Sequence, residues 1–77
     1  MTLQAIASYE KVVQIKPNNY FAWFYLGKVL ETMQRYDEAI ACYEMAIQIK
    51  PDYPIARDNL DSVLKELERD VASDRKL

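Results

Sequence analysis

Residues 5–17 read AIASYEKVVQIKP, and residues 39–51 read AIACYEMAIQIKP. The two segments lie 34 positions apart and share nine of their thirteen residues. Extended to residues 5–30 and 39–64, the comparison gives thirteen identities in 26 positions, where ordinary composition gives about one or two by chance. The chain is therefore built on an internal repeat with a period of 34 residues.

The repeated unit is predicted to be helical, because its apolar residues recur at the spacing of one helix face. The first copy carries the apolar stripe Ala22, Leu26, Val29, Leu30 and Met33. The second copy carries the same stripe 34 residues later, at Ala56, Leu60, Val63, Leu64 and Leu67, and Val71 extends it.

Two prolines set the helix boundaries, because proline disfavours the helical conformation of the residue before it. Pro17 and Pro51 each end a helix, and Asn18, Asn19 and Asp52 follow them as suitable N-caps. We expect four helices with short connections, so that neighbours pack roughly antiparallel, at about residues 3–16, 20–33, 37–50 and 54–71.

The composition excludes several classes of function. The chain has 77 residues, a net charge of −2, no histidine and one cysteine, Cys42. This argues against a surface for nucleic acid or anionic lipid, against a disulfide, and against a histidine- or cysteine-ligated metal. The longest uncharged stretch, residues 17–27, is too short to span a bilayer, and no signal peptide is visible. We therefore expect no cofactor, no nucleic-acid partner and no membrane contact, and a cytoplasmic location.

Particular residues within the repeat carry a family resemblance. The stretch Trp23-x2-Leu26-Gly27-x2-Leu30, followed by Ala39-x3-Tyr43, Ala46 and Pro51, resembles the tetratricopeptide repeat, whose period is also 34. The resemblance implies an all-α fold of antiparallel helix-turn-helix repeats, a fragment of an α–α superhelix.

Each of these motif residues has a packing role. The small residues Gly27, Ala39 and Ala46 permit close approach of helix axes. The large residues fill the space between the helices, and Pro51 breaks the chain so that the next helix can turn back. These large residues are Trp23, Leu26, Leu30 and Tyr43.

The resemblance divides a single domain, residues 1–77, into four parts. Residues 1–19 correspond to the second helix of a partial repeat, and residues 20–53 to one complete repeat. Residues 54–72 are expected to form a C-terminal capping helix, with a frayed tail at 73–77. Arg57 and Asp61 support the cap, because they stand where the first copy has Trp23 and Gly27.

One turn departs from the family pattern. The family usually has glycine at the turn inside a repeat, and this chain has Gln34. A residue other than glycine in the left-handed conformation costs about 1 kcal/mol. We therefore expect a turn of somewhat different geometry at this position.

The resemblance implies a protein–protein interaction scaffold, in which the first helix of each repeat lines a concave groove for a partner peptide. Aromatic side chains opposite the Leu26 stripe are suitable as anchors, and Lys28 is suited to pair with a partner carboxylate. The candidate partner-binding residues are Phe21, Phe24, Tyr25, Lys28, Asn59 and Ser62. On this interpretation, replacing Phe24 by alanine weakens binding without unfolding the chain.

The alternative for Phe21 and Phe24 is packing against neighbouring helices or a second copy. The sequence also bears on two other kinds of partner. The helix at 3–16 is apolar over a wide arc, which predicts an exposed N-terminal face for self-association into a dimer or a longer array, at Leu3, Ile6, Val12 and Val13. Some members of the family bind acidic chaperone tails through a clamp of Lys, Asn and Arg. Here Phe24 and Lys28 stand at clamp positions with the wrong side chains, and only Asn59 matches.

An enzyme is not indicated. Cys42 is a lone thiol with no histidine to activate it, and it is expected to be a small packing residue. Asp37 and Glu38 begin a predicted helix, where the helix dipole favours negative charge. The sequence has no nucleophile–base pair and no glycine-rich phosphate loop.

Overall fold

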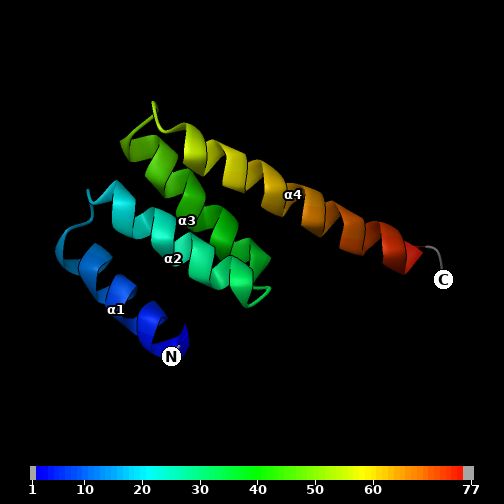
Figure 1. Cartoon of the computed structure of the whole chain (residues 1–77), viewed down its shortest axis with the longest axis horizontal. Helices are drawn as coiled ribbons and strands as arrows, with labels where there is room; N and C mark the ends of the chain where they lie inside the picture. Colours follow the sequence, from blue (N-terminus) through cyan, green and yellow to red (C-terminus); the bar gives the residue numbers. More distant parts are fainter. Residues whose placement is uncertain (1, 76–77) are drawn as a thin grey trace.

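A computed structural model shows four α-helices that lie side by side in chain order (Figure 1). It describes the backbone of residues 2–75 and the side chains of residues 3–69. Consecutive helices run antiparallel, with α2 between α1 and α3, and α3 between α2 and α4. The predicted all-α fold is confirmed. The helices are α1 (Thr2–Ile15), α2 (Tyr20–Thr32), α3 (Tyr36–Ile49) and α4 (Pro54–Arg75).

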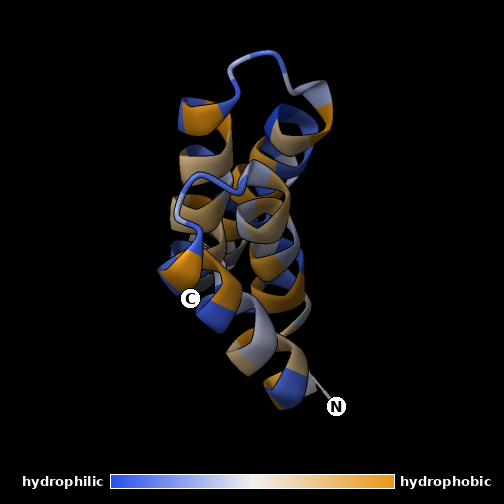
Figure 2. Ribbon diagram, turned by 90° about the vertical axis from the view of Figure 1, so that its left-hand side faces the viewer, coloured by the Kyte–Doolittle hydropathy of each residue, from blue (hydrophilic) through white to orange (hydrophobic). Residues whose placement is uncertain are grey.

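The connections begin and cap the helices largely as the sequence predicts. The Asn19 side-chain oxygen accepts a hydrogen bond from the Ala22 backbone N–H at 3.1 Å, so Asn19 is the N-cap of α2. Helix α4 begins at Pro54, which leaves Asp52 one residue too early to cap it. Figure 2 shows that the connecting loops are hydrophilic, while the helical turns alternate hydrophobic and hydrophilic segments.

The turn between α2 and α3 corrects one expectation. Gln34 has φ 62°, so it adopts the left-handed conformation although it is not glycine. The Arg35 N–H donates to the Leu30 carbonyl at 2.9 Å, and the Gln34 N–H donates to the Glu31 carbonyl at 2.9 Å. These two bonds define a Schellman motif, which satisfies the carbonyl groups at the end of α2. The turn thus keeps the geometry that glycine favours.

Helices α2 and α3 approach each other closely at Gly27. A Cβ atom added there would lie 2.8 Å from Cε1 of Tyr43, closer than real Cβ contacts. Tyr43 is fully buried together with Ala39 and Ala46, and its hydroxyl donates to a Glu31 carboxylate oxygen at 2.7 Å. The small residues therefore do what the sequence predicts: they make room for one large ring between two helices.

The remaining motif residues also pack as expected. Leu26 and Leu30 are buried in the core, and Trp23 packs against it. The Trp23 indole N–H also donates to the Pro17 carbonyl at 2.9 Å, which ties α2 to the loop before it. Pro51 lies in the loop between α3 and α4, outside both helices.

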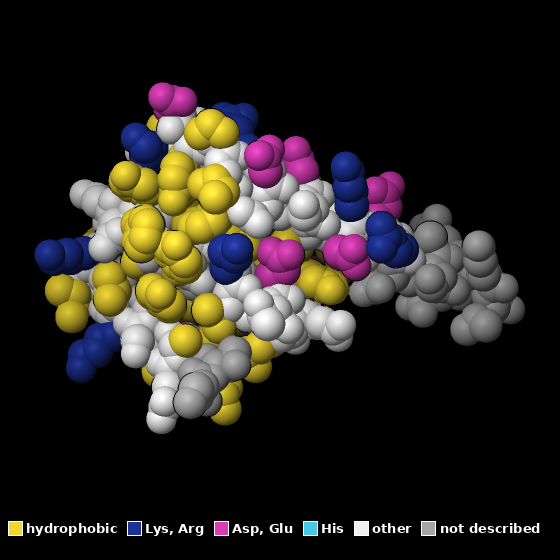
Figure 3. Space-filling view, in the orientation of Figure 1, with side chains coloured by type: hydrophobic (Ala, Val, Ile, Leu, Met, Phe, Trp, Pro, Cys, Tyr) yellow, Lys and Arg dark blue, Asp and Glu magenta, His cyan; other side chains and the backbone are white. Residues whose placement is uncertain are grey.

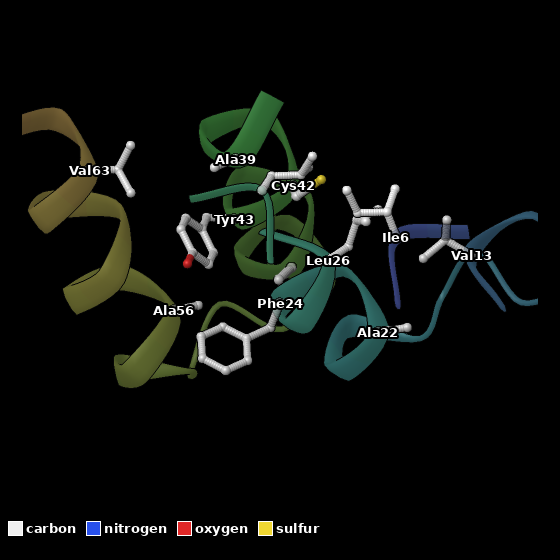
Figure 4. Packing of buried hydrophobic residues seen from close by; sticks show 12 residues of the cluster. Ile6, Val13, Ala22, Phe24, Leu26, Ala39, Cys42, Tyr43, Ala56 and Val63 are labelled. Atoms are coloured by element: carbon white, nitrogen blue, oxygen red, sulfur yellow. The ribbon is translucent and has the colours of Figure 1, made fainter. Parts of the chain in front are cut away.

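The expectation that Ile6 and Val13 lie on an exposed face is wrong. Both side chains are buried, and they belong to the same core cluster as Leu26 and Cys42 (Figure 4). The helical wheel assigned only one neighbour to α1. In the structure, α3 also approaches from behind α2, so that Val13 and Cys42 line a common groove. Of the four predicted residues of this face, Leu3 is exposed and Val12 is half-buried.

Helix α4 is longer than predicted. It runs to Arg75, so residues 73–75 of the expected frayed tail are helical, and residues 76–77 lie outside the described part of the chain. Its N-terminal half packs against α3 and α2 through Ala56 and Val63, which are fully buried. Its C-terminal half extends past the other three helices (Figure 1).

Candidate binding surface

A strip of aromatic side chains crosses the molecule from α1 to the start of α4. Rings from α1, from α2 and from the loop before α4 form an unbroken series of contacts. Figure 3 shows the hydrophobic side chains that gather over these elements, and the charged side chains that gather along α4 beyond them. We call this series the aromatic strip; its members are Tyr9, Tyr20, Phe21, Phe24, Tyr25 and Tyr53.

Tyr25 contacts two other rings of the strip, Tyr9 on α1 and Phe21 on α2. Its ring lies 4.5 Å from that of Phe21 and is stacked on that of Tyr9 at 6.0 Å, centroid to centroid. Phe21 is 52% exposed, although its ring is large and wholly apolar. A half-exposed phenylalanine in contact with a neighbouring ring offers a large apolar area with few rotatable bonds, which suits an anchor for a partner.

Phe24 is part of the core, and the expectation of an exposed anchor at this position is wrong. It is only 3% exposed, and its ring contacts those of Tyr25, Tyr43 and Tyr53 at 5.2–5.8 Å. The wheel places Phe24 opposite the Leu26 stripe, but α4 and its preceding loop cover that side of α2 (Figure 4). Phe24 therefore forms the floor of the strip.

Two lysines border the strip. The Lys28 ammonium lies 6.0 Å from the centroid of Phe24, and the Lys50 ammonium lies 5.3 Å from that of Tyr20. Among the described residues neither lysine has an ion-pair partner. Exposed cation–π contacts of this kind contribute about 0.5–1 kcal/mol each, so both ammonium groups stay available to a carboxylate.

The two predicted residues of α4 lie outside the ring contacts of the strip. The Asn59 side-chain amide donates to the Ile55 carbonyl, one turn earlier in its own helix, at 2.7 Å. Ser62 is exposed. The structure thus places Phe21, Tyr25 and Lys28 on α2, while Asn59 and Ser62 lie on α4, outside the ring contacts of the strip.

Sequence reasoning missed three members of the strip. Tyr9 aligns in the repeat with Tyr43, for which the motif implies a packing role only. Tyr20 and Tyr53 lie at helix starts, where their rings meet at 5.0 Å. The only available signal was the density of tyrosine: the chain has six.

The buried titratable groups are held in their neutral forms. Burial raises the pKa of Cys42 to about 11, and the carboxylates of Glu38 and Glu10 raise it further. Burial and then the hydrogen bond to Glu31 raise the pKa of Tyr43. A thiol that stays protonated at neutral pH is not a nucleophile, so Cys42 acts in packing.

Two other kinds of site are absent from the described residues. No three side chains of the metal-ligating types among residues 3–69 gather closely enough to hold an ion. Within residues 2–75, no helix combines the length and the hydropathy that crossing a bilayer requires.

Family models of the tetratricopeptide repeat match two stretches of the chain. One matches residues 20–53, which hold α2, α3 and the loop that follows, and a second matches residues 2–19, which hold α1. The chain belongs to the tetratricopeptide repeat family. Comparison with curated proteins finds no match.

Family membership places the aromatic strip in context. Tetratricopeptide repeats are generally protein–protein interaction modules, typically scaffolds without enzymatic activity. In this tetratricopeptide-repeat chain the complete repeat supplies four of the six rings from α2 and a fifth, Tyr53, from its last position. The strip therefore lies mainly on the repeat itself.

Proposed function

We propose that this tetratricopeptide-repeat chain binds a short segment of a partner protein across the aromatic strip. One observation supports this most: six rings from three elements are in continuous contact over the buried Phe24, and Phe21 among them is half-exposed. A surface of this kind is rich in the residue types that carry most of the energy of protein–protein interfaces.

The chemistry of the strip suggests the kind of segment that it binds. Its rings offer apolar area at low entropic cost, and its tyrosine hydroxyls can hydrogen-bond to peptide backbone groups. Lys28 and Lys50 add a positive charge at the edges. We therefore expect a segment with apolar or aromatic side chains next to an aspartate or glutamate.

A selection from a random peptide library, followed by affinity measurements, tests the proposal. The selected peptide is titrated against the wild-type chain, against Phe21→Ala and against the matched control Leu64→Ala, which truncates an exposed apolar side chain away from the strip. We expect Phe21→Ala to weaken binding by about tenfold or more, and Leu64→Ala to change it by less than about twofold. Equal affinity of the two variants would contradict the proposal.

The charge at the edge of the strip has a separate test. Lys28→Glu is expected to weaken the same peptide more at low salt than at high salt, since screening reduces the interaction between exposed charges. Lys11→Glu, at an exposed site on α1, makes the same change of charge and serves as the control. If both variants lose the same affinity, only the net charge matters and Lys28 has no specific role.

Self-association is the alternative function, and it has less support. Leu3 and Ile15 are each 68% exposed on α1, but Ile6 and Val13 are buried inside the chain. Sedimentation over a range of concentrations separates the two functions. A monomer of about 9.0 kDa throughout supports peptide binding by the free strip, and a dimer supports self-association.

A further inference from the structure

A second groove lies between α3 and α4, on a different part of the surface from the aromatic strip. It holds about 520 Å³ and is lined by Glu44, Ile47 and Gln48 of α3 and by Arg57, Leu60 and Asp61 of α4. Subtracting the repeat period of 34 from these numbers gives the corresponding positions on α1 and α2. They are Glu10, Val13, Gln14, Trp23, Leu26 and Gly27.

The two equivalent grooves differ in their neighbours, because a third helix borders the α1–α2 groove and no further described helix borders the α3–α4 groove. Helix α3 packs on α2 and forms one wall of the α1–α2 groove, whose lining residues Leu26 and Leu30 are only 4% and 3% exposed. No described helix covers the α3–α4 groove, so Leu60 is half-buried and Leu64 is 44% exposed. Leu26 and Leu30 pack beneath α3, and the equivalent Leu60 and Leu64 are available to receive a helix in the same way.

One substitution changes which helix the open groove can accept. Tyr43 of α3 packs against α2 only because residue 27 has no Cβ atom, which would lie 2.8 Å from the ring. The equivalent position in the open groove is Asp61, which has a Cβ atom and a carboxylate. A helix in this groove therefore needs a small side chain where α3 has Tyr43.

The same argument disfavours a second copy of this chain as the occupant. In a head-to-tail stack, α1 of the second copy would take the place of the covering helix. Residue 9 of α1 corresponds to residue 43 and is also tyrosine, so its ring would meet Asp61. Val12 adds further bulk, because it corresponds to the fully buried Ala46.

The charges around the α3–α4 groove indicate which charged side chains a bound helix carries on its flank. Glu44 and Asp61 are exposed on its rim, against the single cation Arg57, and none of the three has an ion pair among the described residues. In the α1–α2 groove, Glu38 of α3 lies across from Glu10. Arg35 neutralises the charge of Glu38 by a two-point ion pair at 2.6 and 3.1 Å. At the open groove a cation in the place of Glu38 would face Glu44.

We propose that the α3–α4 groove binds an amphipathic helix of a partner protein. That helix carries alanine or glycine where α3 has Tyr43, and lysine or arginine where α3 has Glu38. Its apolar face covers Leu60 and Leu64, as α3 covers Leu26 and Leu30. This docking site is independent of the aromatic strip.

Peptides derived from α3 test the proposal. The probe is residues 36–50 of this chain with Glu38→Lys, Tyr43→Ala and Cys42→Ala, and the matched control peptide keeps Tyr43 but has the other two changes. We expect the probe to bind the wild-type chain at least about tenfold more tightly than the control peptide, since the tyrosine ring clashes with Asp61. Failure of the probe to bind, or equal binding of the two peptides, would overturn the proposal.

Replacing Asp61 by glycine is expected to reverse the preference between the two peptides. Asp61→Gly makes room for the ring, so the control peptide is expected to bind this variant at least as tightly as the probe does. Asp61→Ala keeps the Cβ atom and is expected to retain the wild-type preference; circular dichroism confirms that both variants are folded. An unchanged preference in Asp61→Gly would contradict the steric argument.

A variant of the strip separates this site from the proposed function. Phe21→Ala is expected to leave the affinity for the probe unchanged within about twofold, while Leu64→Ala lowers it. If Phe21→Ala lowers the affinity and Leu64→Ala does not, the probe binds the aromatic strip and the groove is not its site.

Discussion

Helices α2 and α4 carry the same apolar stripe at the same repeat positions, yet their surroundings differ. In α2 the leucines at 26 and 30 are enclosed between α1 and α3. In α4 the equivalent leucines at 60 and 64 face an open groove. The faces away from the stripe differ as well: Phe21 and Tyr25 on α2 correspond to Ile55 and Asn59 on α4.

The two copies of the repeat have some residues in common and differ at others, and the two groups of residues have different roles. Some residues identical in both copies, such as Ala22 and Ala56, are buried where helices pack. Residues that differ between the copies give α2 the rings of Phe21 and Tyr25, and give α4 Ile55 and Asn59 in their place. The structure therefore gives pairs of equivalent positions at which the same substitution should have different effects.

The leucine pair at 30 and 64 should show the largest difference. Leu30→Ala removes a buried side chain and is expected to lower the free energy of unfolding by about 2–5 kcal/mol. Leu64→Ala removes a side chain that is already half-exposed and should lower it by less than about 1 kcal/mol. Urea unfolding of both variants measures the difference. Equal losses of unfolding free energy would contradict the contrast between the buried Leu30 and the half-exposed Leu64.

The pair at 27 and 61 comes next. Gly27→Ala places a Cβ atom against the buried ring of Tyr43 and is expected to lower the free energy of unfolding by about 1–3 kcal/mol. Asp61→Ala changes an exposed helical residue and should stay within about 0.5 kcal/mol. If Gly27→Ala turns out to be stabilising, the ring yields easily and the steric part of the groove argument fails.

Alkaline pH should reveal the burial of Cys42, whose equivalent in the first copy, Ser8, is exposed. Burial raises the pKa of Cys42 from 9.0 to about 11 in the folded chain. The stability that this shift contributes is fully present below pH 9 and is lost as the pH rises toward 11, by about 2 kcal/mol. Cys42→Ala should lose less stability over this range than the wild type when both are unfolded by urea in reducing buffer. Parallel pH curves for the two proteins would show that the thiol does not contribute.

The turn residue gives the smallest effect and a change of sign. Gln34→Gly is expected to stabilise the chain by about 0.5–1 kcal/mol, because glycine adopts the left-handed conformation at no steric cost. The equivalent exchange in α4, Glu68→Gly, falls inside a helix and should destabilise the chain by up to about 1 kcal/mol. Thermal unfolding distinguishes the two outcomes; a destabilised Gln34→Gly would mean that the side chain stabilises the turn in another way.

The sequence predicts the periodic features of the fold well. The 34-residue spacing predicted four helices, and the prolines and the small residues predicted where they end and where they approach closely. These features depend on local geometry and on pairs of residues within one repeat, which a single sequence displays directly.

The errors share one physical cause. A helical wheel describes one helix at a time, and it contains no information on which third helix covers its far side. Phe24 was predicted to be exposed although α4 and its loop cover it, and Ile6 and Val13 were predicted to be exposed although both belong to the buried core cluster. Gln34 shows a second limit, because the Schellman hydrogen bonds outweigh an unfavourable residue preference.

The most direct test of the central claim is a chemical-shift titration of the labelled chain with a library-selected peptide. If the aromatic strip binds the partner segment, the backbone and ring resonances of Phe21, Tyr25 and Tyr9 should shift most, and those of the α3–α4 groove should stay in place. Shifts confined to Ile47, Leu60 and Asp61, with the strip unchanged, would contradict the account.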